Sequence, residues 1–398
     1  MSLPPAYVRF AYLLVMIAPL ILWVPSWTPI VLTLFVTISQ NGFAPSFMPS
    51  NEWFFIVIIL AILLFRYNKD HIPTRPLLIL LVIYSFAVNT LTGGTSEEIY
   101  QPLLCVFLFA FIVPQNNSDL PHLFSYAFIV ASLAISILFF FYGDAFTVQV
   151  GDEERAYWSD PNYLGCQIGM GFTAGLIELF IVKKRTWIEY VIIIATLILS
   201  FIVLFRIASR GAIVAIAIPF LLLTLFSKVK VLYKVIIAIV LCYLLYFVYT
   251  NGIMNAIIFR LTNEGTLETA GSRITIWSTK LKSFFSTDTN FLKLLFGYGN
   301  LGGQQLGYSS IRGFHNDFLA FLVEFGFIGF IAFIILMFKP LKEKNNRIIV
   351  MSASMYLVAC CMGLEPLSHG ILPFYAFLFY IYLWSKSPDN SMPQTSAR

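Results

Sequence analysis

The sequence predicts an all-α polytopic membrane protein with 12 or 13 transmembrane helices and one long hydrophilic loop. Of its 398 residues, 59% are hydrophobic and only 11% are charged, whereas about a quarter of the residues of a soluble domain are charged. Apolar runs long enough to cross a bilayer recur along the chain, and only helices or closed barrels satisfy their own backbone hydrogen bonds there. Because these runs lack the alternation of barrel strands, we expect helices.

The distribution of Lys and Arg predicts which loops face the cytoplasm, because short cytoplasmic loops collect positive charge. Of the 25 basic residues, 15 fall in five segments that we expect to be cytoplasmic: 66–76, 183–186, 227–234, 339–347 and the C-terminal tail. Counting one span at a time from these anchors puts five other segments on the opposite side: 93–100, 144–160, 206–211, 251–313 and 365–370. The stretch 8–40 fits either two short helices around Pro25 or one span with a re-entrant piece, so the number of spans stays at 12 or 13.

This alternation divides the chain into four parts. We expect transmembrane helices with short loops in 1–250, the long exported loop in 251–313, C-terminal transmembrane helices in 314–385 and a disordered cytoplasmic tail in 386–398. The long loop favours an enzyme acting at the exported surface, because a transport bundle rarely needs such a loop.

Two arginines mark the exported end of one expected span. Arg206 and Arg210 are four residues apart, so on a continuous helix they would share one face. A guanidinium matches phosphate oxygens and keeps its proton, so the pair could clamp a pyrophosphate. Snorkelling to the membrane interface is the alternative, but it is usual for basic residues on the cytoplasmic side. We therefore favour a functional role.

A histidine opens the span that follows the long loop. At helical spacing His315 would lie above Leu319 and would not contact Glu324. A histidine is suited to take a proton from a sugar hydroxyl at neutral pH, and Asn316 could orient it or cap the helix. The alternative is an interfacial histidine beside a first-turn acid, Asp317. The glycines of this segment are expected to serve close helix packing: Gly326 and Gly329.

Two weaker candidates lie in exported segments. Arg273 and Trp277 are one helical turn apart in the long loop, where they could bind sugar and phosphate or could pack without a ligand. Before another span, Asp160 followed by Pro161 is by default a helix N-cap and first helical residue. Four residues of this segment could line a sugar site: Arg155, Asp160, Asn162 and Tyr163.

Several other kinds of site are not expected. The chain has no His and Cys cluster at zinc-ligand spacing and no carboxylate pair for a metal-bound nucleotide sugar, so we expect no metal and no cofactor. Gly297-Tyr298-Gly299 with Gly302 and Gly303 should form a flexible loop and not a nucleotide fingerprint, because no strand precedes it and we expect it to lie outside the cell. We expect no nucleic-acid partner. His122 falls in an expected cytoplasmic loop, where it would be an ordinary surface residue.

The motifs, in this order, resemble those of the bacterial O-antigen polymerase and ligase superfamily. The residues that carry the likeness are Ser209-Arg210-Gly211, Arg273 with Trp277, and His315-Asn316 followed by Glu324, Gly326 and Gly329. The likeness extends to Asp160-Pro161-Asn162-Tyr163 and Gly297-Tyr298-Gly299, so it spans 153–330.

The resemblance implies a GT-C-like glycosyltransferase in the bacterial inner membrane, surrounded by membrane lipid, with its active site and the long loop in the periplasm. It implies a metal-independent transfer of an undecaprenyl-pyrophosphate-linked oligosaccharide. Arg210 and Arg273 would neutralise the departing pyrophosphate, and His315 would deprotonate or orient the acceptor hydroxyl. The remaining candidates would bind substrate: Arg206, Arg155, Asp160, Asn162, Tyr163, Trp277, Asn316 and Glu324.

Three functions stay open at this point. A polymerase, which joins repeat units and would have a chain-length regulator protein as partner by the same resemblance, is favoured over a ligase that transfers the glycan to lipid A core. A flippase or exporter of lipid-linked oligosaccharides should place charges deep in its spans. The spans 187–205 and 232–249 contain only Glu189 and Lys234, both near their inner ends, which disfavours that alternative.

Overall fold

The computed structural model describes the chain from residue 120 onward with gaps, and little before it. The described residues are 84, 87–88, 120–142, 147–150, 153–156, 161–181, 185–227, 229–255, 257–258, 264–286, 289–299, 306, 314–364, 366–367 and 372–387. The spans expected before residue 120 therefore lie almost wholly outside the described residues.

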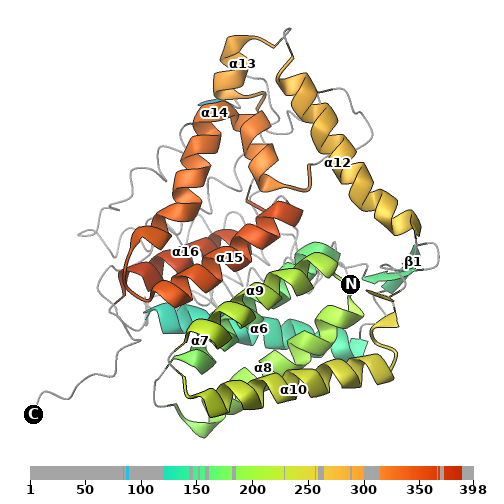
Figure 1. The fold of residues 1–398 in the computed structure, drawn as a ribbon, viewed down its shortest axis with the longest axis vertical. Helices are drawn as coiled ribbons and strands as arrows, with labels where there is room; N and C mark the ends of the chain where they lie inside the picture. The colour runs from blue at the N-terminus through green and yellow to red at the C-terminus, as the bar shows by residue number, and fades with distance from the viewer. Residues whose placement is uncertain are drawn as a thin grey trace, which may run out of the picture.

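The described part of the chain is helical except for one two-stranded hairpin, in agreement with the predicted fold class (Figure 1). The hairpin is antiparallel, pairs Thr147 with Ala156, and lies in the segment 144–160, where no strand was expected. In chain order the elements are α6 (Leu120–Tyr142), β1 (Thr147–Val150), β2 (Glu153–Ala156), α7 (Pro161–Phe180), α8 (Trp187–Arg206), α9 (Arg210–Phe226), α10 (Val231–Thr250), α12 (Glu264–Phe284), α13 (Phe291–Phe296), α14 (Asp317–Phe338), η6 (Lys339–Lys342), α15 (Arg347–Gly363) and α16 (Leu372–Lys386).

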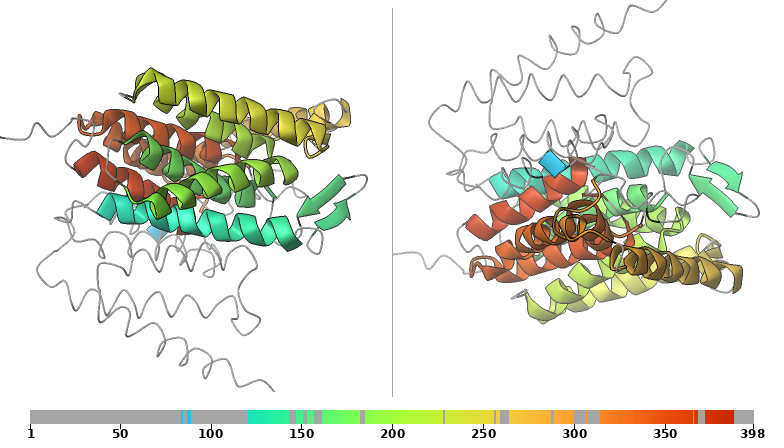
Figure 2. Two further views of the ribbon diagram at one scale, coloured as in Figure 1. Left: turned by 90° about the horizontal axis from the view of Figure 1, so that it is seen from below. Right: turned by 90° about the horizontal axis from the view of Figure 1, so that it is seen from above.

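A bundle of apolar helices forms the main body. Within the described residues, five helices meet the length and composition expected of a membrane span: α6, α7, α8, α10 and α14, the last of which is interrupted at Gly326. Helices α6 to α10 lie side by side with nearly parallel axes, and α15 and α16 complete the bundle (Figures 1 and 2). Helix α10 lies along its outer side, where only Leu244 and Val248 of its side chains are buried. An apolar helix with so little burial is suited to contact lipid, as expected of a membrane protein.

Helix α15 runs antiparallel to α7, which brings its end close to the start of α7. Asn346, just before α15, donates to the Trp384 carbonyl oxygen at 3.1 Å, and the Trp384 ring packs on His122, which contacts Glu178 near the end of α7. Ten residues later, the Tyr356 hydroxyl donates to the carbonyl oxygen of Cys166, near the start of α7. The connection that follows α15 is therefore at the same end of the bundle as the start of α7.

Helix α14 is not the single straight span that the sequence predicts. Gly326 has φ 63° and ψ −169°, which interrupts the helix and separates a first arm (317–325) from a second arm (327–338). The ring of Phe321 stacks on that of Phe333 at 4.2 Å, although twelve residues of continuous helix would separate them by about 18 Å. The two arms therefore fold back on each other as a helical hairpin (Figure 1).

A second, smaller core lies where the long loop meets the first arm of α14. Its buried side chains come from both sides of residue 313: Phe284, Tyr298, Leu306, Phe314, Ala320, Leu322 and Val323. Trp277 of α12 and Leu294 of α13 pack against these residues. The helices of the long loop are thus held against the start of α14 by a common apolar core.

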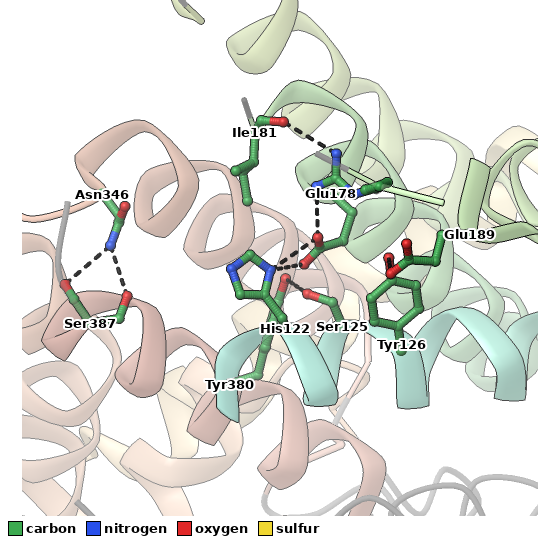
Figure 3. A network of polar contacts seen from close by, with 10 residues as sticks. His122, Ser125, Tyr126, Glu178, Ile181, Glu189, Asn346, Tyr380 and Ser387 are labelled. Carbon is green, nitrogen blue, oxygen red and sulfur yellow. Dashed lines mark hydrogen bonds and ion pairs between the residues drawn. The ribbon is translucent and has the colours of Figure 1, made fainter. Parts of the chain in front are cut away.

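A buried ionic cluster lies at the other end of α7, and it corrects the prediction for His122. His122 is on the first turns of α6 and only 6% exposed, so it is not a surface residue. Its Nδ1 lies 3.0 Å from Oε1 of Glu178, which is fully buried in α7, and the Arg185 guanidinium contacts Glu178 Oε2 at 2.9 Å (Figure 3). Burial lowers the pKa of Arg185, but the facing carboxylate raises it by more, so the pKa lies above its ordinary value. The prediction failed because Glu178, the partner that allows His122 to be buried, is remote in sequence.

Candidate functional site

The starts of α7 and α9 meet at one end of the bundle, and they bring two of the predicted motifs together. The Ser209 hydroxyl, at the N-cap of α9, donates to Oδ1 of Asn162 in the first turn of α7 at 3.4 Å. The helices approach closely because Gly165 has no side chain: a Cβ there would lie 2.8 Å from that of Ser209. Tyr163 turns to the other side and packs edge-on against Phe374 of α16, with ring centroids 6.4 Å apart.

Arg206 and Arg210 do not share a helical face, contrary to the prediction. Arg206 is the last residue of α8, Arg210 is the first of α9, and between them Ala208 has φ 56°. A left-handed residue breaks the helical repeat, so the spacing of four residues no longer places the two side chains one above the other. The turn separates the two arginines into different environments.

Arg206 contacts the end of α6. Its Nη1 donates to the carbonyl oxygen of Phe140 at 3.3 Å, and its guanidinium lies 5.9 Å from the centre of the Phe139 ring. The last carbonyls of a helix have no partner within it, so a guanidinium is a favourable cap there. This contact explains Arg206 without a ligand. Arg210 stands partly exposed at the start of α9.

His315 precedes α14 and is not part of it, contrary to the expectation that it opens the helix above Leu319. The helix begins at Asp317, and Asn316 is its N-cap, as the sequence suggested: Asn316 Oδ1 accepts from the Leu319 N–H at 3.2 Å. His315 has φ 50°. A non-glycine residue in this conformation costs about 1–3 kcal/mol, and such strain is concentrated at functional sites.

The long loop reaches the His315 turn through α12. Trp277 Nε1 donates to the carbonyl oxygen of Phe314 at 2.6 Å, and the Lys280 ammonium lies 4.3 Å from the centre of the Phe314 ring. Arg273, one turn before Trp277 on the same helix, is partly exposed. The structure therefore joins the Arg273 and Trp277 motif to the His315 motif. Lys280 was not singled out from the sequence, although its position three residues after Trp277 placed it on the same face.

The start of α14 is also tied to the connection between α15 and α16. Asp317 donates its backbone N–H to the Leu364 carbonyl oxygen at 3.0 Å, and its Oδ2 accepts from the Leu367 N–H at 3.0 Å. Because this connection lies at the end of the bundle where α7 begins, His315 and Asn162 are at the same end of the molecule. The two groups of motif residues thus face the same side of the bundle.

Glu324 lies at the far end of the first arm of α14. Seven residues of helix separate it from Asp317, a rise of about 10 Å, so the structure does not bring Glu324 and His315 together. The Glu324 side chain is buried, and its backbone carbonyl accepts from the Gly299 N–H at 2.9 Å.

The described part of the predicted flexible loop, 297–299, is fixed by contacts, contrary to the prediction, and Gly302 and Gly303 lie outside the described residues. All three described residues are buried, and Tyr298 and Gly299 donate their N–H groups to carbonyls of the first arm at 2.9 Å each. Gly297 has φ 84°, and a Cβ on it would lie 2.2 Å from the Glu324 carbonyl oxygen. Glycine is needed here for close backbone approach, which fixes the segment against the hairpin tip.

Two predicted residues are described only in part or not at all. Arg155 lies in β2 opposite Val148, and its side chain is outside the described part. Asp160 is also outside it, although α7 begins at Pro161, as expected for a residue that follows an N-cap. Among the described residues, no group of three or more His, Cys, Asp or Glu side chains could hold a metal ion.

The comparison with known families covers part of the segment that carries these motifs. Residues 195–334 match the family model described as O-antigen ligase. The match begins within α8 and ends within the second arm of α14, so it includes the turn with Arg206 and Arg210, the long loop and the His315 turn. No curated protein matches the chain.

Proposed function

We propose that this chain, which belongs to the O-antigen polymerase and ligase superfamily, is an O-antigen polymerase. It would join undecaprenyl-pyrophosphate-linked oligosaccharide repeat units at the periplasmic face of the bacterial inner membrane. The observation that carries the proposal is the junction of α12 with the start of α14, because it unites an arginine-bearing helix with a histidine in a strained turn.

Transfer from such a donor requires positive charge near the pyrophosphate and an acceptor hydroxyl held close to the sugar. A sugar bonded to pyrophosphate is already activated, so bond breaking mainly requires that the charge on the departing pyrophosphate be stabilised. The acceptor hydroxyl must approach the anomeric carbon and lose its proton as the new bond forms. Two arginines and one histidine supply these needs without a covalent intermediate.

Arg210 is suited to bind the pyrophosphate. A cation at a helix N-terminus is normally unfavourable, because it faces the positive end of the helix dipole. An anion placed there is attracted both by the guanidinium and by the N–H groups of the first turn. The contact between Ser209 and Asn162 holds the start of α9 in place, so Asn162 serves the site by positioning.

His315 is the proposed base, and Arg273 is the second pyrophosphate ligand. An imidazole takes up a proton near neutral pH, which suits removal of the hydroxyl proton. The other predicted binding residues fall into two groups, those that support the structure around the site and those that remain proposed sugar ligands. Trp277 and Asn316 fix the His315 turn, Arg206 caps α6, and Tyr163 and the buried Glu324 support the helices around the site. Arg155 and Asp160 remain proposed sugar ligands from the hairpin side.

A ligase is the second candidate, because the matching family model carries that description. It would use the same donor and the same residues but transfer the glycan to a lipid A core sugar. A flippase is less well supported. The buried carboxylate of Glu178 in α7 pairs with Arg185, which follows that helix, so this charge does not line an open path for a charged headgroup.

Deletion of the gene in its host, followed by gel electrophoresis of the lipopolysaccharide, tests the proposal. Loss of the ladder with a single repeat unit left on the core indicates a polymerase. Absence of O-antigen from the core, with polymer accumulating on its lipid carrier, indicates a ligase and overturns the polymerase assignment. An unchanged ladder excludes both, and accumulation of donor on the cytoplasmic side indicates a flippase.

Complementation assigns the residues. Wild-type protein should restore the ladder, whereas His315→Ala, Arg210→Ala and Arg273→Ala should not, at equal amounts of protein in the membrane. Lys282→Ala is the matched control for Arg273→Ala, because Lys282 is exposed on the same helix. Restoration of a normal ladder by any of the three site variants removes that residue from the mechanism.

A further inference from the structure

Lys280 is buried to an extent that is rare for a lysine. Its side chain is 0% exposed, on a helix whose neighbouring residues Thr279 and Lys282 are partly or fully exposed. Lysine is almost never fully buried unless its charge is compensated. The compensation described here includes the Phe314 ring, whose centre lies 4.3 Å from the ammonium. An aromatic face attracts a cation, and more strongly when both are removed from water.

Two side chains of α12 converge on the same residue. The Trp277 indole N–H donates to the carbonyl oxygen of Phe314 at 2.6 Å, and the Lys280 ammonium lies over the Phe314 ring. Phe314 is itself only 2% exposed and belongs to the small core between the long loop and the first arm of α14. Its backbone and its side chain are thus fixed independently, one residue before His315.

Lys280 could either bind phosphate together with Arg273 or act on the turn that carries His315, and the spacing along α12 favours the second role. Arg273 and Lys280 are seven residues apart, which corresponds to about 10 Å of helix rise. We therefore do not expect the guanidinium and the ammonium to bind the same phosphate group. Lys280 lies instead at the level of Trp277 and Phe314, where its contact acts on the turn that carries His315.

We infer that Lys280 is a positioning residue whose ammonium, together with the Trp277 N–H, fixes Phe314 and thereby holds His315 in its left-handed conformation at the start of α14. On its other side this turn is fixed by the Asn316 cap and by Asp317. The consequence for glycosyl transfer rests on the proposed function, in which His315 acts on the acceptor hydroxyl. The positioning itself does not depend on that reaction.

The first test measures the His315 turn directly. The full-length protein in lipid nanodiscs is treated with diethyl pyrocarbonate, and labelling of each histidine is followed over time by peptide mass spectrometry. In Lys280→Met, which keeps the length of the chain but removes its charge, His315 should be labelled about threefold faster or more, because the turn opens locally. Trp277→Phe should have the same effect, and Lys280→Arg should label as wild type, because a guanidinium also binds an aromatic face.

Two internal controls accompany this test. Lys282→Met, exposed on the same helix, should leave the His315 rate unchanged, and buried His122 should stay slowly labelled in every variant that is folded. Trp277→Phe keeps an aromatic ring at this position but removes the hydrogen bond to Phe314. It therefore tests the same turn if the Lys280→Met protein does not accumulate. Equal His315 labelling in wild type and folded Lys280→Met, or in wild type and Trp277→Phe where Lys280→Met does not fold, overturns the inference.

The second test asks whether Lys280 acts through His315. With purified protein and a lipid-pyrophosphate-linked donor, Lys280→Met should lower kcat by about 10- to 100-fold with little change in KM, as expected when a catalytic group is displaced. In the His315→Ala background it should lower kcat by less than about twofold, because the two changes remove the same effect. Equal losses in both backgrounds overturn the inference. A wild-type protein without transfer activity would instead contradict the proposed function and leave the labelling result to decide the positioning.

Discussion

The Phe321 ring stacks on the Phe333 ring with centroids 4.2 Å apart and planes inclined by 6°. The contact is possible only because the chain reverses at Gly326, between the two arms of α14. The hairpin tip is covered by the segment 297–299 and by Tyr84, whose hydroxyl donates to the Phe325 carbonyl oxygen at 2.7 Å.

The first prediction concerns the hairpin tip. Gly326→Ala should lower the free energy of unfolding by more than about 2 kcal/mol, since the new residue is strained at φ 63°. Its Cβ would also lie 2.4 Å from backbone atoms of Leu295. Thermal unfolding in detergent measures the loss. Gly363→Ala is the matched control, because a Cβ there meets nothing within 4 Å. Similar melting temperatures for the two variants would show that the reversal at Gly326 is not required.

The second prediction separates the two arginines at the turn between α8 and α9. Arg206→Ala should lower stability by about 1 kcal/mol through loss of the Phe140 hydrogen bond, and it should keep the polymer ladder. Arg210→Ala should leave stability nearly unchanged and abolish the ladder. Lipopolysaccharide gels and melting curves of the same protein preparations give both readouts. Equal loss of the ladder in the two variants would restore the prediction that the arginines act as a pair.

The third prediction concerns the strain at His315. His315→Gly should be as stable as wild type or more stable by about 0.5–1 kcal/mol, because glycine adopts a positive φ without steric cost. The same variant should lose the ladder, because the proposed base is gone. Such a result separates function from folding in a single substitution. A large fall in the melting temperature would mean that the imidazole stabilises the turn and that its conformation is not strained.

The sequence predicted the elements more successfully than the contacts between them. The apolar runs that became α8 and α10, the start of α7 at Pro161 and the cap at Asn316 each depend on residues within one turn or one span. The failure at Gly326 has a physical cause. Whether a helix continues through a glycine is decided by what packs against it, and the backbone that meets Gly326, at Leu295 and Gly297, belongs to the preceding long loop.

The candidate site shows the same division. The residue types of three candidates suit phosphate and proton chemistry, so the sequence predicted them: Arg210, Arg273 and His315. Lys280 has no such signal in the sequence, because its contact with the Phe314 ring depends on the fold. His122 was misassigned for the opposite reason, since a histidine near a helix start is usually exposed. Only the fold reveals that Glu178 lies opposite it, 56 residues away.

The last prediction concerns this ionic cluster at the end of the bundle remote from the candidate site. Glu178→Ala would leave Arg185 and His122 buried without their carboxylate, so it should cost about 3–5 kcal/mol of stability, the usual loss when one partner of a buried pair is removed. The control is Glu343→Ala, whose ion pair with Lys386 is exposed and should contribute at most about 1 kcal/mol.

Sixteen residues of helix, about 24 Å, separate Glu178 from Asn162. Any Glu178→Ala protein that remains folded should therefore keep its kcat for glycosyl transfer. Equal stability of the two variants, or a folded Glu178→Ala protein with a much lower kcat, would show that the cluster does more than hold α6, α7 and α8 together.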